Sequence, residues 1–316
     1  DAMDIVDRQD VPAQPPRADD VHDATVFDDL VIGTGMAGLT VGALLAAHGR
    51  RVLALEAHDV PGGYAHTFAM GAYRFCAEVH YIFNCAPGEA IPRLLADEGM
   101  AGEVEFNRLD PDGYDHVVIA WERTRIPSGW ETFRDRMLAL HPDASTPLRR
   151  YFSTIAALRD ELDALPEDPG AWDLLTAPLR FPHVLRHRAH TLQHLFDAEH
   201  MPPGLQAILA GQAGDYLLPP ERISLLLHAT LVTSYGRGAW YPRRHFSHLV
   251  DTLVRAITAR PGCHVLTGQE VDRVDVEKGR VTAVHTRAGR TFRARRVISN
   301  MDPARTVDIV GRHHFP

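Results

Sequence analysis

The stretch VFDDLVIGTGMAG, residues 26–38, decides the fold of this 316-residue chain. Its first half indicates a short buried strand, and the alanine- and leucine-rich run from residue 36 to residue 48 predicts a helix that ends at Gly49. A second buried strand is predicted by RVLALEA, residues 51–57. This order of strand, glycine turn, helix and strand is a βαβ unit, whose two strands run parallel because the connection crosses over. We therefore expect an α/β fold with a Rossmann-like parallel sheet.

The three glycines of this turn follow the pattern G-x-G-x-x-G. Gly33 permits a tight turn, Gly35 lets the backbone approach a pyrophosphate, and Gly38 lets the helix pack close to the strand. The partial positive charge of a helix N-terminus favours phosphate. Glu56, eighteen residues after Gly38, is expected to accept hydrogen bonds from a ribose diol. The pattern therefore predicts dinucleotide binding, and the alternative is a βαβ unit whose glycines serve packing alone.

A second glycine pair favours FAD over NAD as the cofactor. Gly62 and Gly63 follow the acid by six residues and allow another close approach of the backbone. The residues expected to bind FAD are Gly33, Thr34, Gly35, Met36, Ala37, Gly38, Glu56, Ala57, Gly62 and Gly63.

Charge and cysteine content exclude several classes of protein. Of the formal net charge of −8, residues 1–29 contribute −7, with nine Asp against two Arg, so the rest of the chain is close to neutral and predicts no nucleic-acid partner. The three cysteines match neither a disulfide framework nor a zinc site, which predicts no metal and a cytoplasmic location. Residues 1–24, rich in Asp and Pro, predict a disordered acidic tail. The uncharged residues 30–48 contain four glycines, and we interpret them as strand, turn and helix rather than a membrane span.

The chain organisation predicts a discontinuous cofactor domain interrupted by a helical lobe. Prolines divide residues 101–235 into helical stretches, among them 130–140, 148–165, 185–196 and 221–234. After a further helix at 246–259, three alternating runs predict strands, with a hairpin turn at EKGR, residues 277–280. We therefore assign residues 25–100 and 236–316 to the FAD-binding domain, a parallel sheet with a β-hairpin insertion, and residues 101–235 to a largely helical substrate lobe.

Several segments together resemble the phytoene desaturase, carotenoid isomerase and retinol saturase family of FAD-dependent oxidoreductases. They are LEAHDVPGGYAHTF (55–68), GAYRFCAEVHYIF (71–83), IPSGWETFRDRM (126–137), GQAGDYLLPPERISLLLHA (211–229), GAWYPRRHFSHLVDTLVRAI (238–257) and RRVISNMDP (295–303). The resemblance implies a helical lobe over an apolar tunnel, an apolar polyene or isoprenoid-like substrate that is desaturated, saturated or isomerised, and an adenine contact at Val271. Two alternatives remain open, a flavin-dependent amine or alcohol oxidase and a non-catalytic lipid- or partner-binding remnant.

The chain departs from this family's pattern in three respects. Where relatives have F-D-T-G-x-H beside the flavin, it has Phe75-Cys76-Ala77-Glu78-Val79-His80. Glu78 and His80 are the catalytic candidates, Glu78 as a general acid or base with its pKa raised in the tunnel. In the alternative interpretation, Glu78 pairs with Arg74 or solvent and His80 only makes a structural hydrogen bond. Two arginines, at 243 and 244, replace glycines and predict a site for an anionic head group or an exposed loop. Relatives also continue past VISNMDP, so we expect a missing C-terminal segment or a second polypeptide to complete the FAD site.

A histidine-rich stretch suggests contact with a membrane surface. The histidines at 183, 187, 190 and 194 would share one face of the predicted helix, where only Asp197 offers a carboxylate, so metal binding is disfavoured. Neighbouring arginines and the apolar Leu185, Leu192, Leu195 and Phe196 fit an interfacial helix on anionic lipid. A solvated helix is the alternative. The expected location is therefore the cytoplasm, with peripheral membrane contact as an option.

Overall fold

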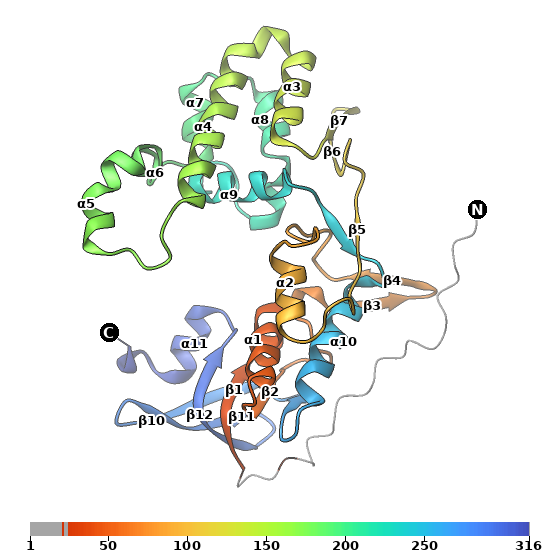
Figure 1. Ribbon diagram of the computed structural model, residues 1–316, viewed down its shortest axis with the longest axis vertical. Coiled ribbons are helices and arrows are strands. Elements are labelled where there is room, and N and C mark those ends of the chain that lie inside the picture. Colours follow the sequence, from red (N-terminus) through yellow and green to blue (C-terminus); the bar gives the residue numbers. More distant parts are fainter. Residues whose placement is uncertain (1–20, 22–24, 316) are drawn as a thin grey trace. The chain divides into compact units, whose positions relative to one another are not determined.

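The computed structural model describes Val21 and residues 25–315, so the prediction of a disordered tail at 1–24 lies, apart from Val21, outside the described residues. The chain divides into two compact units (Figure 1). We call them the sheet unit, which runs up to His80 and includes residues 85–107 and 241–316, and the helical unit, residues 81–84 and 108–240. The chain passes from one unit to the other within two short strands, β5 (Phe106–Arg108) and β8 (Trp240–Pro242), and also on either side of residues 81–84.

The sheet unit is built on a six-stranded sheet with the order β10-β11-β12-β1-β2-β9. Strands β12, β1, β2 and β9 run parallel, and β10, β11 and β12 are joined antiparallel. The expected α/β fold, a parallel sheet with a β-hairpin insertion, is thus confirmed. The bounds are β1 (Val26–Ile32), β2 (Val52–Leu55), β9 (His264–Leu266), β10 (Val271–Glu277), β11 (Arg280–Thr286) and β12 (Thr291–Ser299).

Two helices cover the central strands. Helix α1 (Met36–Ala47) packs against β2 and against α10 (His245–Thr258), which also contacts β9. A Cβ on Gly42 would lie 2.9 Å from Cδ1 of Ile257, so this glycine lets the two helices approach. All four residues of β2 are buried, as expected of a parallel strand covered by helices. The uncharged residues 30–48 are the end of β1, the glycine turn and α1, and no helix in the described part of the chain is long and apolar enough to cross a membrane.

Smaller elements complete the sheet unit. They are the hairpin of β3 (Thr67–Met70) and β4 (Tyr73–Cys76), helix α2 (Ala90–Asp97) and helix α11 (Pro303–Val310), which packs on β10. Within residues 71–83, only β4 is a regular strand.

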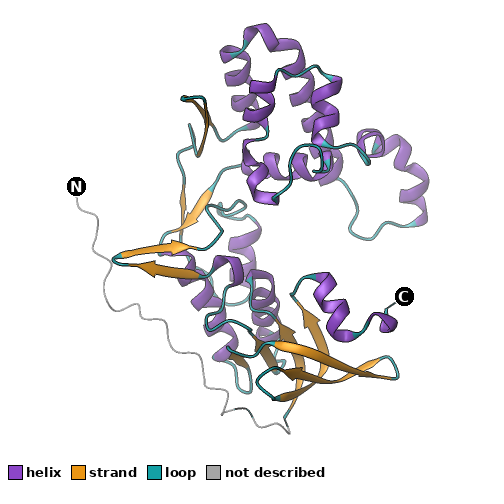
Figure 2. Ribbon diagram, turned by 180° about the vertical axis from the view of Figure 1, so that it is seen from behind, coloured by secondary structure: helices purple, strands orange, loops and turns teal. Residues whose placement is uncertain are grey.

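The helical unit contains α3 (Trp130–Leu140), α4 (Ser145–Asp163), α5 (Ala171–Arg180), α6 (Pro182–His187), α7 (Leu192–Ala198), α8 (Pro203–Leu209) and α9 (Leu225–Tyr235). It also has a hairpin of β6 (Asp115–Ile119) and β7 (Glu122–Ile126), and Figure 2 shows how strongly helix dominates the rest. Its core is rich in large aromatic side chains, among them Tyr151, Phe152 and Phe196.

A buried histidine lies in this core. Nε2 of His228 is 2.8 Å from the Tyr151 hydroxyl and Nδ1 is 2.8 Å from the Tyr216 hydroxyl. Burial lowers the pKa of His228 to about 3. The ring is therefore neutral at physiological pH and holds the two tyrosines by one donated and one accepted hydrogen bond.

The single helix predicted at 185–196 is wrong. The chain forms two short helices, α6 and α7, because Thr191 caps α7 by accepting a hydrogen bond from the backbone N–H of His194 (3.3 Å). Leu192, Leu195 and Phe196 are buried in the core of the helical unit, so they do not form the lipid-facing surface that the sequence suggested. Helix α5 was not predicted.

Candidate functional site

The glycine turn between β1 and α1 is built so that only glycine fits. Gly33 has φ +91°, and its N–H donates to the carbonyl oxygen of Leu55 on β2 (2.8 Å). A Cβ on Gly38 would lie only 2.1 Å from the carbonyl oxygen of Gly33. The turn is therefore held tightly against the strand end, and α1 begins at once.

The N-terminus of α1 is open to an anion. Its N-cap is Gly35, which offers no side-chain cap, and the first turn contains no acidic residue. Met36 is half-buried and Ala37 is exposed, so the first backbone N–H groups of this twelve-residue helix face accessible space. Unpaired N–H groups and the helix dipole together suit a phosphate group, and the site thus fits the pyrophosphate of a dinucleotide.

Glu56 and Thr34 hold one another at the end of β2. One carboxylate oxygen of Glu56, Oε2, accepts hydrogen bonds from the Thr34 N–H (2.9 Å) and hydroxyl (2.5 Å), and Oε1 accepts one from the His58 N–H (2.9 Å). Thr34 is fully buried, so it orients Glu56 and does not face a ligand. Oε1 keeps room for a further donor, which is what a ribose hydroxyl would supply.

The second glycine pair packs against the first turn. The Gly62 N–H donates to the carbonyl oxygen of Thr34 (2.9 Å), and a Cβ on Gly63 would lie 2.9 Å from Cα of Gly35. The backbone of this pair therefore packs directly against the backbone of the first glycine turn. It brings Gly62 and Gly63 beside the open N-terminus of α1.

Sequence reasoning missed Asn300 as a member of this site. Its N–H donates to the carbonyl oxygen of Ile32 (2.8 Å), and its amide nitrogen Nδ2 would lie 2.9 Å from a Cβ on Gly35 and 3.2 Å from one on Gly38. The available signal was its position directly after β12, because ligands of such sheets bind at the carboxyl ends of parallel strands.

The segment before β10 runs beside Glu56. The Gln269 N–H donates to the Glu56 carbonyl oxygen (2.7 Å) and the Gly268 N–H to that of His58 (2.9 Å). Val271, which is buried, begins β10 two residues later. The structure thus brings the glycine turn, Glu56, the exposed Ala57 and the Val271 segment to one edge of the sheet.

A buried carboxylate paired with two partly exposed arginines supports the strand that carries this site. Asp29 of β1 has no exposed surface and accepts hydrogen bonds from the guanidinium groups of Arg50 and Arg296, the latter at 2.6 Å. Burial alone would raise the pKa of Asp29, but the two arginines outweigh it and hold the pKa below 3.8.

The two catalytic candidates lie after β4 and are both exposed. The structure does not enclose Glu78 in an apolar tunnel, and the Glu78 N–H donates to the carbonyl oxygen of Tyr64 (3.2 Å), the residue after Gly63. Their catalytic assignment therefore stays a prediction.

Arg243, the candidate for binding an anionic head group, is engaged within the protein. The guanidinium of Arg243 pairs with the carboxylate of Glu105 at 2.7 Å, with both side chains exposed, which favours the exposed-loop interpretation.

The histidines at 187, 190 and 194 stay close to one another across the break between α6 and α7. The Nδ1 atoms of His187 and His190 are 3.1 Å apart, and the rings of His190 and His194 stack at 5.1 Å. No group of three or more His, Cys, Asp or Glu side chains arranged to hold a metal ion is found among residues 25–315.

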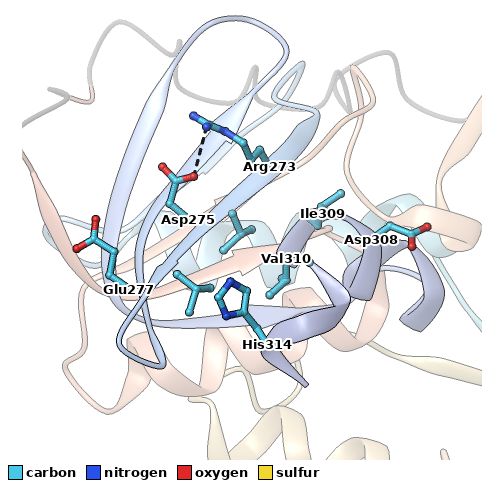
Figure 3. A pocket seen from close by; sticks show the side chains of 10 residues that line it. Arg273, Asp275, Glu277, Asp308, Ile309, Val310 and His314 are labelled. Carbon is cyan, nitrogen blue, oxygen red and sulfur yellow. Dashed lines mark ion pairs between the residues drawn. The ribbon is translucent and has the colours of Figure 1, made fainter. Parts of the chain in front are cut away.

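An open hollow of about 440 Å³ lies elsewhere in the sheet unit (Figure 3). β10 and α11 form most of its wall, which includes Glu277, Asp308 and His314 and an ion pair between Arg273 and Asp275 at 3.5 Å. None of the predicted cofactor residues lines it. It is therefore distinct from the site at the glycine turn.

Comparison with known proteins is consistent with this geometry. Residues 36–306 match the family described as flavin containing amine oxidoreductase. The chain belongs to this family. Membership confirms the predicted resemblance to flavin-dependent oxidoreductases, while the roles of the individual site residues stay predictions.

The relatives of this chain confirm the resemblance seen in the sequence. The chain is 28% identical to the all-trans-retinol 13,14-reductase of Rattus norvegicus, over 83% of this chain and 45% of that protein. It is 25% identical to the hydroxyneurosporene desaturase of Cereibacter sphaeroides, over 87% and 56%. It is 40% identical to a Danio rerio protein named inactive all-trans-retinol 13,14-reductase, over 80% and 43%. The chain thus spans less than half the length of the reductases it matches.

A solved structure shows the same fold. The cyclohexylamine oxidase of Brevibacterium oxydans aligns with a TM-score of 0.62 over 92% of this chain and 61% of that one, at 21% identity. At this identity the likeness concerns the fold alone.

Proposed function

We propose that the protein of which this chain is a part is an FAD-dependent oxidoreductase that acts on C–C or C=C bonds of a long apolar polyene. The observation that carries the proposal is the open, uncapped N-terminus of α1 beside Glu56, in a chain of the flavin oxidoreductase family. The polyene class is supported by the names of the relatives, a retinol reductase and a carotenoid desaturase.

Each part of the site has one task in this proposal. The N–H groups of Met36 and Ala37 hold the pyrophosphate, and the free lone pairs of Glu56 accept the ribose hydroxyls. Val271 contacts the adenine. Bound FAD supplies the acceptor or donor of a hydride, which together with a proton makes up the two hydrogens that separate a saturated from an unsaturated bond.

Further elements of the proposal concern groups outside the glycine turn. Glu78 and His80 serve as proton-transfer groups, and further chain, covalent or in a second polypeptide, covers them and excludes water. The protein acts in the cytoplasm on a substrate that dissolves in apolar surroundings.

One observation favours a second candidate, a non-catalytic lipid-binding protein. The Danio rerio relative at 40% identity carries the word inactive in its name. Product formation, and not flavin content, distinguishes the enzyme from the non-catalytic binding protein, because a non-catalytic relative can keep the nucleotide site.

The test uses the natural polypeptide that contains these residues. Purified protein is expected to show a flavin absorbance band, and incubation with retinol or a carotenoid under oxidising and reducing conditions is expected to change the substrate mass by two hydrogens. A bound flavin with no change in mass or isomer for any polyene supports the non-catalytic candidate. Peroxide release with an amine or alcohol instead identifies an oxidase.

A matched pair of variants tests the nucleotide site itself. Glu56→Gln replaces one accepting oxygen by an amide and is expected to weaken flavin binding by about tenfold, the effect of about one lost charge-assisted hydrogen bond. Asp59→Asn, an exposed acid three residues away, is expected to leave flavin binding unchanged. Equal flavin content in both variants argues against the assigned role of Glu56.

A further inference from the structure

Helix α5 (Ala171–Arg180) exposes its apolar face. The exposed fractions are 72% for Trp172, 68% for Leu174, 72% for Leu175 and 87% for Leu179, and no residue of the helix is buried. Their spacing places these side chains on one broad face of the helix. α5 lies at the outer edge of the helical unit in both views (Figure 1, Figure 2).

The polar face of the same helix is the more covered one. Asp173 accepts a hydrogen bond from the Gly170 N–H (3.0 Å) and pairs with Arg180 at 2.7 Å. The hydroxyl of Thr176 donates to the carbonyl oxygen of Trp172 (2.9 Å). Asp173 and Thr176 are half-buried, while the apolar residues face solvent. This orientation is the reverse of that in an ordinary surface helix.

The helix is anchored at its C-terminal end. Phe181, directly after α5, is buried, and the Glu161 carboxylate of α4 accepts hydrogen bonds from the N–H groups of His183 (3.0 Å) and Val184 (2.8 Å) at the start of α6. The apolar face therefore belongs to a helix fixed to the helical unit, and it is presented outward.

Basic residues follow α5 in the chain. Residues 171–190 contain three arginines, Arg180, Arg186 and Arg188, and one acid, Asp173, which is paired with Arg180. Arg186 and Arg188 are exposed. The two acidic residues that precede α5, Glu167 and Asp168, lie at its N-terminal end, whereas these arginines follow its C-terminal end. An apolar face with tryptophan, next to exposed arginines, is the pattern of a helix that lies in the interface of a bilayer with anionic lipids.

We propose that α5 docks the protein on an anionic membrane surface, with the side chains of Trp172, Leu175 and Leu179 inserted among the acyl chains and Arg186 and Arg188 at the lipid phosphates. This contact does not depend on the redox activity proposed above. In this proposal α5 takes the place of residues 185–196, which the sequence had suggested as the membrane-facing segment.

The test is flotation of the natural polypeptide with lipid vesicles, which does not require activity. Binding is expected to be about tenfold tighter to phosphatidylcholine vesicles containing phosphatidylserine than to phosphatidylcholine alone, and to weaken at high salt. Leu175→Gln with Leu179→Gln should reduce binding to both vesicle types by about tenfold or more, whereas Arg186→Gln with Arg188→Gln should abolish only the preference for phosphatidylserine. Leu217→Gln is the matched control, because Leu217 is 86% exposed elsewhere in the helical unit.

Three results would overturn the proposal. The first is flotation that the α5 variants leave unchanged or that Leu217→Gln lowers equally. The second is equal binding to neutral and anionic vesicles, which would show that anionic lipid is not required. The third is a dimer in lipid-free solution that Leu175→Gln with Leu179→Gln converts to a monomer while flotation stays as before, because α5 would then be an interface between two copies. Unchanged thermal unfolding of each variant establishes that the fold is intact.

Discussion

Glu98 offers a quantitative test of how the sheet unit buries charge. The residue follows α2, 3% of its surface is exposed, and neither carboxylate oxygen has a hydrogen-bond partner among the described residues. Burial, and to a smaller extent the neighbouring Asp97, raises the pKa of Glu98 from 4.5 to about 7. The folded state therefore binds a proton that the unfolded state releases between these two pH values, and this contribution to stability is complete below 4.5 and lost as the pH rises through about 7.

The size of the effect follows from the pKa difference. At about 1.4 kcal/mol for each pH unit, the interval from 4.5 to about 7 corresponds to about 3 kcal/mol. The side chain of Glu98→Gln cannot titrate. The difference in free energy of unfolding between variant and parent should therefore shift by about 3 kcal/mol in favour of the variant as the pH rises from 4 to 8. Any constant cost of the buried amide cancels in this comparison.

The assay is urea unfolding of parent and variant at closely spaced pH values, followed by circular dichroism. Glu167→Gln, at an exposed loop position, is the control and should run parallel to the parent protein. If the Glu98→Gln and parent curves also run parallel across this range, Glu98 is hydrated in solution and the reasoning from its burial is refuted.

Three further predictions test the site and its supports. Gly38→Ala should lower both the flavin content and the melting temperature, since its Cβ has no space. Gly204→Ala, on a helix where an added Cβ would meet no atom within 4 Å, should instead raise the free energy of unfolding by about 0.5–1 kcal/mol. Equal melting temperatures for the two variants would contradict this. Asp29→Asn should cost about 1–3 kcal/mol in urea unfolding at pH 7 because the buried acceptor loses its charge, while both guanidinium groups stay partly exposed to solvent. Since the pKa of Asp29 lies below 3.8, the parent protein should keep this stability until the pH falls below that value. His228→Phe should gain about 3 kcal/mol relative to the parent protein between pH 7 and pH 4, because the parent loses stability as the pH falls from 6.5 toward the lowered pKa of about 3; a pH-independent difference would show that burial does not lower the pKa of His228.

The geometry of the glycine turn was readable from sequence because its determinants are local. The tight turn at Gly33, the packing at Gly38 and the acid at Glu56 lie within one βαβ unit, where spacing alone sets the geometry. The helix at residues 130–140 was equally readable, since its limits follow from its own periodicity.

Long-range members of the site were not readable in this way. Asn300 reaches the glycine turn because β12 pairs with β1 across more than 260 residues of chain, and no spacing rule spans such a distance. The same pairing makes Arg296 a partner of Asp29.

The sequence by itself determined the parallel sheet, the glycine turn and the class of cofactor, because backbone conformation and hydrophobic periodicity are properties of short segments. Only the tertiary structure decided which side of each helix is covered. It broke the histidine-rich stretch into two helices, buried Leu192 and Phe196, and left Leu179 in solvent, since burial depends on the neighbours that packing supplies and these come from distant parts of the chain.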